Sequence, residues 1–523
     1  MILDLSIWRR NAVGRALAVL ILLGALGIES PYVQAQLPGR SVLIKNARIL
    51  TMSGDPIDQG SILIKGNRIA AIGRDLDAPL FCKVFDASGM TATPGLIDAW
   101  SALGRLGHGV KADPTASAWD AFDSYDRAAL REALSFGITT AYVAPGGGPG
   151  INGRGAIVRL LPGKGGMAGE LVTDEAAVSI NLGSDQSSVA RMKTFYAVRQ
   201  AFKKALTYRR SLEDYEEDLK EYLEKLKERR EKEASAGDKK DGGHKSKDKK
   251  SDKDSEAKGK DAPDKKKPKP EKSADGMSLW SQRTGDGSLG RRKKEKKSDK
   301  EKNGAKDKNG EEKEKEKEEE ITKPTEPDRD PSSEVLLKAI DHESVVRIEA
   351  RRSADLLNAL ELAEEFGIDI MLEGATDAAL VVDALADAEV PVVLGPPIHS
   401  MAFEDDATRR FNPDTSAALT EASVAWTVGS GGGDPQAARF VGLFAQMMAG
   451  HADGQDHWLA TVTRRAADLL GLKRSGRLRP GMRADIVLWN SDPGEPDSRA
   501  QRVYVGGRLA FKAKPAQPKG GVR

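Results

Sequence analysis

The sequence predicts an α/β protein that combines a (β/α)8 barrel of the TIM type with a small β-sandwich built from N- and C-terminal strands. In the middle of the chain, short apolar runs alternate with helical patterns, which is typical of a parallel sheet buried on both faces. Both chain ends instead alternate apolar and polar residues, as half-buried antiparallel strands do. Without a leader and a charged insert, about 390 residues remain, enough for one barrel and a satellite domain.

The strand-like runs of the middle region are rich in β-branched residues, which favours buried strands. They lie at 138–144, 345–350, 368–372, 390–394 and 424–428. A helical pattern at 353–366 separates two of them, as a parallel sheet requires. Alternating segments at the chain ends predict antiparallel strands that meet in one domain beside the barrel. These segments are 41–52, 61–73, 484–490 and 502–509.

The composition excludes several classes of protein. Lysines and arginines number 81 against 79 aspartates and glutamates, for a formal net charge of +2, which excludes nucleic-acid binding through overall basicity. The only cysteine, Cys82, excludes an intrachain disulfide and a cysteine-based zinc cluster. Six histidines in 523 residues leave few ligands for metal chemistry.

The N-terminus is predicted to be an export signal. A basic segment around Arg9 and Arg10 precedes an apolar run at 16–28, which is short for a membrane-spanning helix. Small residues near Ala35 predict cleavage after that residue, so that 1–35 is a signal peptide. The alternative is an uncleaved anchor. Both interpretations place the rest of the chain outside the cytoplasm, in the periplasm or the extracellular space.

Residues 234–331 form a charged, low-complexity insert whose only aromatic residue is Trp280. So little apolar surface cannot offset the conformational entropy of folding, which predicts disorder. The insert is either a solvated linker or a charged tether for a polyanion or the cell envelope. Before it, apolar residues between 212 and 226 recur at three- and four-residue spacing, which predicts an amphipathic helix packed on the core or a short coiled coil.

These features divide the chain into six segments. Two are the signal peptide and the insert, and the others belong in pairs to the sandwich and the barrel. The predicted sandwich comprises 36–90 and 476–523, and the predicted barrel comprises 91–233 and 332–475.

Several motifs carry a family resemblance. The opening contains Gly-Ser-Ile-Leu-Ile-Lys-Gly-Asn-Arg-Ile-Ala-Ala-Ile-Gly at 60–73, Asp-Ala-Ser-Gly at 86–89 and Thr-Pro-Gly-Leu-Ile-Asp at 93–98. The chain closes with Gly-Arg-Leu-Arg-Pro-Gly-Met-Arg-Ala-Asp-Ile-Val-Leu at 476–488. With Gly-Ile-Thr-Thr-Ala-Tyr-Val at 137–143, these motifs resemble the amidohydrolase superfamily, in its imidazolonepropionase-like branch. The resemblance implies a distorted (β/α)8 barrel and a β-sandwich built from both termini.

The family's metal ligands are replaced in this sequence. The family's first barrel strand ends in Pro-Gly-Leu-Ile-Asp-x-His-x-His, and residues two apart on a strand face the same side, so both imidazoles reach one metal. Here Trp100 and Ala102 stand at the histidine positions, and neither side chain can bind a metal. The later ligand positions correspond to Glu349, Gly374 and Gly431. The resemblance therefore implies a degenerate metal site.

The same region predicts a pocket formed by Asp98, Trp100, Glu349, Arg351 and Glu373. Asp98 and Glu349 leave open an atypical site for a hard cation, although such ions need more oxygen ligands than these. Otherwise two arrangements are open. In the first, the guanidinium of Arg351 and the indole of Trp100 line a pocket for an anion or a ring. In the second, Trp100 fills the pocket and Arg351 pairs with Glu349 or Glu373.

The histidines are predicted to be loop or surface residues without a catalytic role, because few convergent partners accompany them. They are His108, His244, His342, His399, His451 and His457. No cofactor is therefore expected. Zinc or another divalent cation is expected only if the site is atypical.

Three hypotheses for function follow. The first is an exported, catalytically degenerate amidohydrolase-like protein that binds or scaffolds a small molecule or a protein, as a homo-oligomer or paired with an active relative. The second is a metal-dependent hydrolase of non-peptide C–N bonds, such as those of cyclic amides, that uses Asp98 and Glu349. The third is an envelope-interaction protein that acts through the Lys/Glu-rich insert. No nucleic-acid partner is expected, and no membrane span after signal cleavage.

Overall fold

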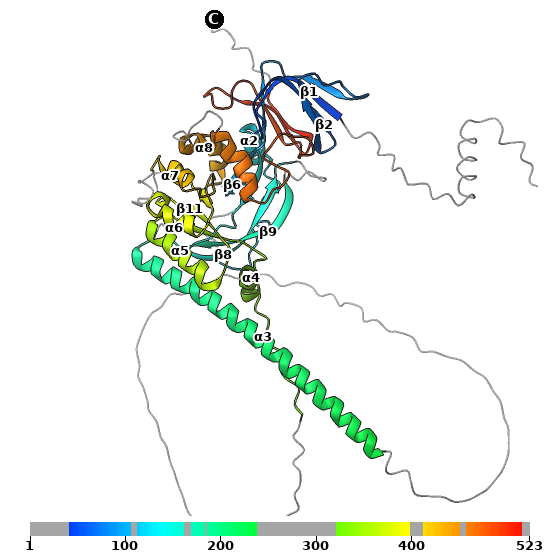
Figure 1. Cartoon of the computed structure of the whole chain (residues 1–523), viewed down its shortest axis with the longest axis vertical. Helices are drawn as coiled ribbons and strands as arrows, with labels where there is room; N and C mark the ends of the chain where they lie inside the picture. The colour runs from blue at the N-terminus through cyan, green and yellow to red at the C-terminus, as the bar shows by residue number, and fades with distance from the viewer. Residues whose placement is uncertain are drawn as a thin grey trace, which may run out of the picture. The chain divides into compact units, whose positions relative to one another are not determined.

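The computed structural model describes residues 41–105, 112–161, 169–183, 186–237, 321–397, 412–449 and 457–514. The predicted signal peptide, residues 238–320 of the predicted insert and four of the histidines, His108, His244, His399 and His451, lie outside the described residues. The chain divides into two compact units, Met1–Asp214 with Glu326–Arg523, and Tyr215–Thr325. The first unit contains both sheets of the protein (Figure 1).

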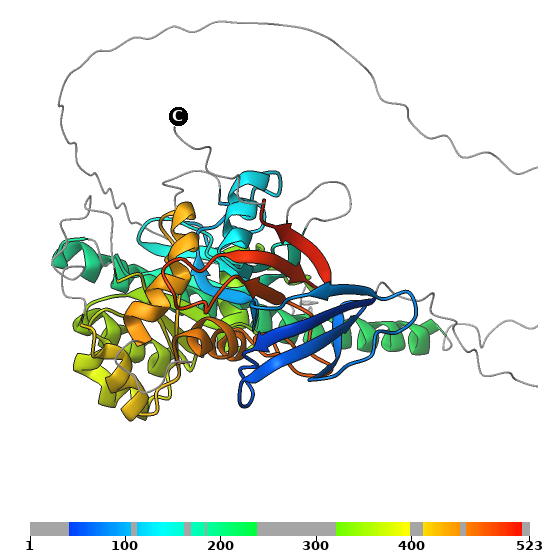
Figure 2. The ribbon, with the colours of Figure 1, turned by 90° about the horizontal axis from the view of Figure 1, so that it is seen from above.

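Strands from both ends of the chain share one sheet, here named the terminal sheet (Figure 2). They are β1 (Ser41–Ile49), β2 (Ile57–Lys65), β3 (Arg68–Gly73), β4 (Lys83–Asp86), β5 (Thr91–Pro94), β14 (Ile486–Trp489), β15 (Ala500–Val505) and β16 (Arg508–Lys512). Their order is β16-β15-β14-β5-β1-β2-β3, with β4 beside β1. The two ends of the chain meet where β5 pairs with β14. The prediction that strands from both ends of the chain come together is confirmed, here in one sheet.

Alternating side chains give the terminal sheet its buried face. Ile44, Ile62, Ile64 and Ile486 are fully buried in one apolar cluster, whereas Lys65 and other polar residues of these strands face solvent. The strand β5, which the predicted boundary at residue 91 assigned to the barrel, belongs to this sheet instead. Its sequence, Thr-Ala-Thr-Pro, is compatible with a strand of either sheet. Only the hydrogen-bonded pairing of β5 shows to which sheet it belongs.

The barrel is a second sheet of eight strands. They are β6 (Leu96–Ser101), β7 (Ile138–Val143), β8 (Gly150–Arg159), β9 (Glu170–Asn181), β10 (Val346–Ala350), β11 (Ile370–Gly374), β12 (Val392–Leu394) and β13 (Trp426–Val428), hydrogen-bonded in this order. The terminal members β6 and β13 meet through a parallel bridge between Ser101 and Gly431. All neighbours are parallel except β8, which runs antiparallel to β7 and β9. The predicted TIM-type barrel is confirmed, and β8 is its main distortion.

Helices pack around the barrel. They are α2 (Arg127–Ser135), α3 (Ser188–Gly237), α4 (Pro331–Ile340), α5 (Ser353–Phe366), α6 (Val382–Asp387), α7 (Thr415–Glu421), α8 (Val441–Ala449), α9 (His457–Ala460) and α10 (Ala466–Leu469), with short turns η2 (Ala378–Val381), η3 (Pro435–Phe440) and η4 (Thr461–Arg465). The bounds of α5 are those predicted. It buries Leu356, Ala359 and Leu362 at helical spacing and ends at Gly367, whose φ of 61° suits a residue without Cβ.

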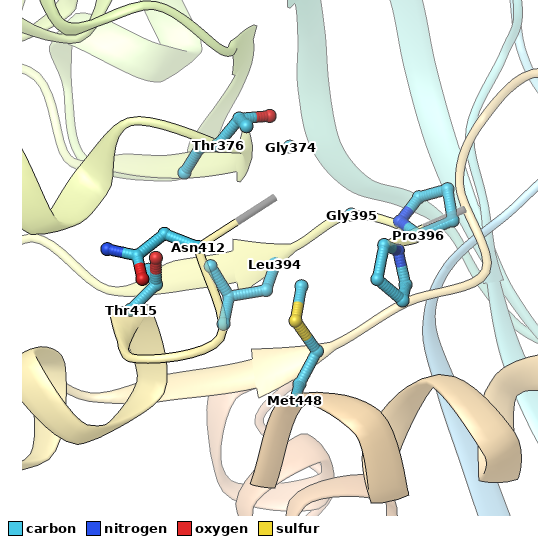
Figure 3. A pocket seen from close by; sticks show the side chains of 10 residues that line it. Gly374, Thr376, Leu394, Gly395, Pro396, Asn412, Thr415 and Met448 are labelled. Atoms are coloured by element: carbon cyan, nitrogen blue, oxygen red, sulfur yellow. The ribbon is translucent and has the colours of Figure 1, made fainter. Parts of the chain in front are cut away.

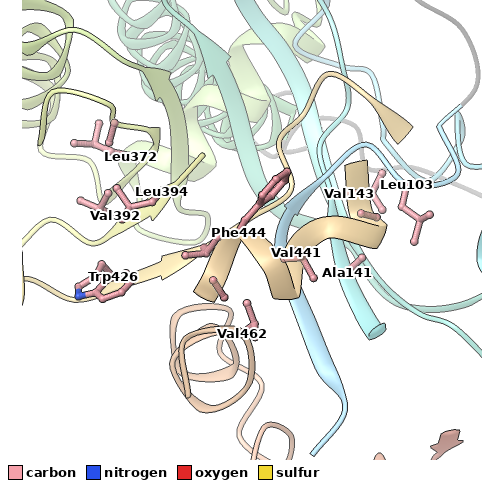
Figure 4. Packing of buried hydrophobic residues seen from close by; sticks show 14 of the residues in the cluster. Leu103, Ala141, Val143, Leu372, Val392, Leu394, Trp426, Val441, Phe444 and Val462 are labelled. Atoms are coloured by element: carbon pink, nitrogen blue, oxygen red, sulfur yellow. The ribbon is translucent and has the colours of Figure 1, made fainter. Parts of the chain in front are cut away.

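The main core lies between the strands and these helices. Figure 4 shows Val441 and Phe444 of α8 beside Leu394 and Trp426 of the strands β12 and β13. All four side chains are at most 5% exposed. Burying side chains of this size stabilises a fold by about 1.5–3 kcal/mol each, so the apolar strand residues that predicted the barrel also hold it together.

The helix α3 leads into the predicted insert and ends at Gly237, three residues beyond the predicted start of the insert at 234. Near its beginning Val198, Phe202 and Ala205 are buried. Between residues 212 and 226 no side chain is buried by the described residues, and the packing predicted for that apolar stripe stays a prediction. After the insert, α4 begins at Pro331, with Asp330 as its N-cap. None of the described helices is long and apolar enough to cross a membrane.

Candidate functional site

The carboxyl ends of the parallel strands form the mouth of the barrel, the end where barrel proteins place their chemistry. The predicted site residues come together there. Asp98, Trp100 and Ala102 lie on or directly after β6, Glu349 and Arg351 lie at the end of β10, and Glu373 and Gly374 close β11. Gly431 follows β13 and donates its backbone N–H to the carbonyl oxygen of Trp100 over 2.8 Å.

Trp100 lies on β6 at the mouth and is 1% exposed. Two glycines leave room for its ring and a third for its Cβ. A Cβ on Gly432 would lie 2.9 Å from the indole Nε1, one on Gly395 would lie 3.1 Å from Cζ3, and one on Gly429 would lie 2.5 Å from the Trp100 Cβ. The indole therefore occupies space that depends on the absence of side chains at Gly395 and Gly432, which follow β12 and β13.

Asp98 is fully buried at the seam between β6 and β13. One carboxylate oxygen accepts the backbone N–H of Ser430 over 2.9 Å, and the other accepts the Ser430 hydroxyl over 2.5 Å. Burial raises the pKa of Asp98 to about 6, although the hydrogen bonds from Ser430 lower it. Asp98 thus joins the two strands that close the barrel.

Arg347 places a buried cation inside the barrel. Its Nε donates to Glu373 over 2.5 Å, its Nη2 donates to the carbonyl oxygen of Ala99 over 2.6 Å, and its guanidinium lies 3.6 Å from the ring centroid of Tyr142. Arg347 is 2% exposed and Glu373 is 1% exposed. Burial raises the pKa of Glu373 to about 7, although the charge of Arg347 lowers it. Burial likewise raises the pKa of the Tyr142 hydroxyl.

Sequence reasoning missed Arg347. The signal was present, because Arg347, Glu349 and Arg351 alternate with Val346, Ile348 and Ala350 along one strand. Residues two apart share a face, and the apolar set packs outward against the helices. The charged set therefore had to face the barrel interior.

Glu349 and Arg351 pair with each other at the rim of the mouth. Arg351 donates to Glu349 over 3.2 Å, and Asn181 of β9 donates to the other carboxylate oxygen over 3.0 Å. The Arg351 guanidinium lies 5.9 Å from the Trp100 ring centroid. Gly374, with a φ of 85°, leaves room for the Arg351 side chain, since a Cβ there would lie 3.1 Å from the Arg351 Cγ.

Little open space remains beside these residues. The cavity shown in Figure 3 has a volume of about 20 Å³, enough for about one water molecule. Leu394, Pro396, Thr415 and Met448 are among the residues that line it. A substrate-sized ligand needs several hundred cubic ångströms. The cavity of Figure 3 is thus too small for a ligand of that size.

The arrangement of these side chains does not fit the catalytic metal that the resemblance implies. Asp98, Glu349 and Glu373 are each engaged by donors of the protein itself, and two of them face guanidinium groups. Within the described ranges, no three side chains of His, Cys, Asp or Glu are grouped to hold an ion. His342 contacts Asp369 over 2.9 Å near the amino end of β10, away from the mouth. For His457, only the position at the start of α9 is described.

Comparison with solved structures identifies the fold. An amidohydrolase from Thermotoga maritima MSB8 superposes with a TM-score of 0.61 over 90% of this chain and 100% of that chain, at 20% sequence identity. The protein has the amidohydrolase fold. The resemblance read from the sequence is thereby confirmed for the fold, whereas the branch within the superfamily stays a prediction.

Sequence comparisons match a smaller part of the chain than the structural comparison does. No protein-family model matches the chain. The allantoinase of Escherichia coli K12 is 34% identical over 105 residues, which is 20% of this chain and 19% of the allantoinase. The chain thus matches about a fifth of the length of these curated relatives. A prolidase complexed with N-methylphosphonate-L-proline is 12% identical and superposes with a TM-score of 0.48 over 91% of this chain.

Proposed function

We propose that this amidohydrolase-like protein is exported and does not catalyse hydrolysis, and that it binds or scaffolds a partner outside the cytoplasm. The observation that carries the proposal is the side-chain packing at the mouth. Trp100 is buried at a position where the family places a metal ligand, and the carboxylates around it are satisfied by Ser430, Arg347 and Arg351. Export rests on the predicted signal peptide at 1–35.

The charges of the mouth support this proposal. A catalytic metal needs ionised ligands that are free to bind it and an open coordination position for water. Here a guanidinium already neutralises Glu373, and another neutralises Glu349. Adding a divalent cation next to Arg347 and Arg351 would bring like charges together in a buried space, which costs several kcal/mol.

One observation favours the alternative, a hydrolase with an atypical site. The pKa of Asp98 is raised to about 6, and general acids and bases work best with pKa values near the working pH. Asp98 has no exposed surface, however, and both of its oxygens accept hydrogen bonds from Ser430. Turnover through Asp98 would require β6 and β13 to separate.

Metal analysis and a turnover assay test the proposal together. The purified chain is expected to retain well below one metal ion per chain after incubation with Zn²⁺ or Mn²⁺. It is also expected to show no turnover of allantoin, β-Asp-Leu or an Xaa-Pro dipeptide, the compounds to which the names of the allantoinase, β-aspartyl dipeptidase and Xaa-Pro dipeptidase relatives point. The Asp98→Asn and Glu349→Gln variants are the matched controls, since they keep side-chain shape and remove the charge.

Two results would contradict the proposal. One is about one tightly held metal ion per chain, the stoichiometry of a catalytic site. The other is turnover of any of these compounds that disappears in Asp98→Asn or Glu349→Gln, which would establish the atypical hydrolase instead.

A further inference from the structure

The second half of the helix α3 carries an apolar seam that the described residues cover only in part. Its members follow one another at alternating spacings of three and four residues, the repeat of a coiled coil. Each of them is half-buried, and the neighbouring Leu223 is 55% exposed. An apolar stripe of this length on a helix indicates packing against a partner surface. We name it the α3 seam, and it consists of Leu212, Tyr215, Leu219, Tyr222 and Leu226.

The same repeat begins in the first half of α3, where the main core covers it. Val198 and Ala205 are buried, and Ala201 between them packs against the core. Ala205 follows Val198 by seven residues, and Leu212 follows Ala205 by seven. One continuous face of α3 is therefore buried in the fold at its beginning, whereas between 212 and 226 the described residues bury none of its side chains.

The charges along the α3 seam form two blocks of opposite sign. Residues 213–218 contain five carboxylates and no cation. Residues 225–232 contain five cations and two carboxylates, and residues 219–224 between the blocks contain one lysine and two glutamates. A helix with this pattern is complementary to a second copy that runs in the opposite direction, because the acidic block of each copy then faces the basic block of the other.

The coiled-coil repeat fixes how two antiparallel seams align. Leu219 of one copy lies opposite Tyr222 of the second copy, and Tyr215 lies opposite Leu226 of the second copy. In this register Asp218, which flanks the seam, comes beside Lys225 of the second copy, and the two-fold symmetry repeats the contact.

A parallel pair would bring like charges together instead. In register, Lys225 would lie beside Arg230 of the second copy, and Arg229 would face its own counterpart at a seam position. Within its own helix, Lys225 pairs with Glu221 over 2.7 Å, but both side chains are more than half exposed, so this pairing is weak. The charges thus favour the antiparallel arrangement.

We propose that two copies of this chain associate through antiparallel packing of their α3 seams. The second copy is the favoured occupant because one helix carries both halves of the charge pattern that its partner must supply. Residues 321–325 belong to the same compact unit as this part of α3. Their only apolar side chains, Ile321 and Pro324, are too few to bury five seam residues. The inference does not rest on the proposed loss of catalysis.

Sedimentation equilibrium of the full chain tests the seam. The parent chain is expected to be a dimer, and Leu219→Gln/Leu226→Gln should raise the dimer dissociation constant at least about tenfold, because glutamine keeps helix propensity but removes apolar contact. Val189→Gln/Met192→Gln is the matched control and should leave the dissociation constant unchanged. These two residues lie on the same helix, off the seam, and are 61% and 70% exposed. Circular dichroism verifies that all variants keep their helix content.

Charge reversal tests the direction of packing. Asp218→Lys and Lys225→Asp each place like charges at two symmetric contacts of the antiparallel dimer, and each should raise the dissociation constant at least about threefold. The double variant Asp218→Lys/Lys225→Asp restores opposite charges and should return to within about twofold of the parent chain. Lys220→Asp is the control, because Lys220 is exposed and does not flank the seam.

Several results would overturn the proposal. A parent chain that stays monomeric up to roughly 0.1 mM would show that the seam is covered within one copy, by residues 321–325 or by another part of the chain. A dimer that Leu219→Gln/Leu226→Gln leaves intact would place the contact elsewhere. Tighter association of Lys225→Asp would indicate the parallel arrangement. None of these measurements depends on metal content or turnover, so the proposed function and the dimer proposal can fail separately.

Discussion

Asp98 and Glu373 are both buried in the barrel, but their partners differ. Asp98 accepts hydrogen bonds from the amide and hydroxyl of Ser430 and has no cation within hydrogen-bonding distance. Glu373 is paired with the guanidinium of Arg347. Burial raises the pKa of both groups, to about 6 and about 7, but only at Glu373 does a full opposite charge act against it.

The difference shows two ways of keeping a carboxyl group inside a fold. A buried ion pair stabilises little beyond a well-packed apolar pair, yet the loss of one partner is costly. A buried carboxyl group with neutral donors is instead most favourable when it is protonated. Glu373 should therefore respond to mutation of its partner as well as to pH, whereas Asp98, which has no such partner, should respond mainly to pH.

The largest effect is expected for Arg347→Met. The change leaves Glu373 buried without its cation, which should lower the free energy of unfolding by about 3–5 kcal/mol at pH 8. Because Arg347 lowers the pKa of Glu373, the loss should be smaller at pH 5, where the variant can protonate the carboxyl group. Urea unfolding at both pH values measures this. The double variant Arg347→Met/Glu373→Leu should regain most of the stability, and a double variant no better than the single one would refute the interpretation.

An intermediate effect is expected for Asp98→Asn. The pKa of Asp98 in the folded state lies above its unfolded value of about 3.9, so its contribution to stability is present below pH 4 and is lost as pH rises through about 6. The variant has no carboxyl group at position 98, so it does not lose this stability as pH rises. It should match the parent chain near pH 4 and exceed it by roughly 2–3 kcal/mol at pH 7, because two pKa units correspond to that free energy. Unfolding free energies measured from pH 4 to pH 7 check this, and a less stable variant at pH 7 would show that Ser430 needs the charged carboxylate.

The smallest effect is expected for Glu349→Gln. The side chains of Glu349 and Arg351 are 22% and 13% exposed, so water weakens their pairing. The amide can still accept from Asn181 or Arg351, and the free energy of unfolding should fall by less than about 1 kcal/mol. A loss as large as that of Arg347→Met would mean that the rim pair is as indispensable as the interior pair.

Much of the fold could be predicted because burial and periodicity coincide. The apolar runs at 138–144 and 345–350 became β7 and β10, and the helix at 353–366 has the expected bounds. The strand β5 was assigned to the wrong sheet, since four residues without a distinct pattern carry no information on their partner. The stripe at 212–226 fits helical packing by spacing alone, but spacing does not show whether a core lies opposite.

The sequence predicted which residues form the candidate site, but not which of them contact one another. Asp98, Trp100 and Glu349 were found from motif positions, and they do lie at one end of the barrel. The assignment of partners was not legible, because Arg347 and Arg351 lie on the same strand at the same parity. Only the folded geometry pairs the first with Glu373 and the second with Glu349. Ser430 also escaped prediction, since a serine in a glycine-rich loop has no sequence signal for a buried acceptor.

The glycines around Trp100 have a consequence for substitutions at this position. A Cβ on Gly395 or Gly432 would crowd the indole, and one on Gly429 would crowd the Trp100 Cβ. Conversely, a small residue at position 100 would leave a hole that the two glycines beside the ring cannot fill. Positions 100, 395 and 432 are thus mutually dependent, because a larger residue at either glycine requires a smaller one at position 100. A Trp100→His substitution alone would therefore place an imidazole at this position without the packing that holds the indole.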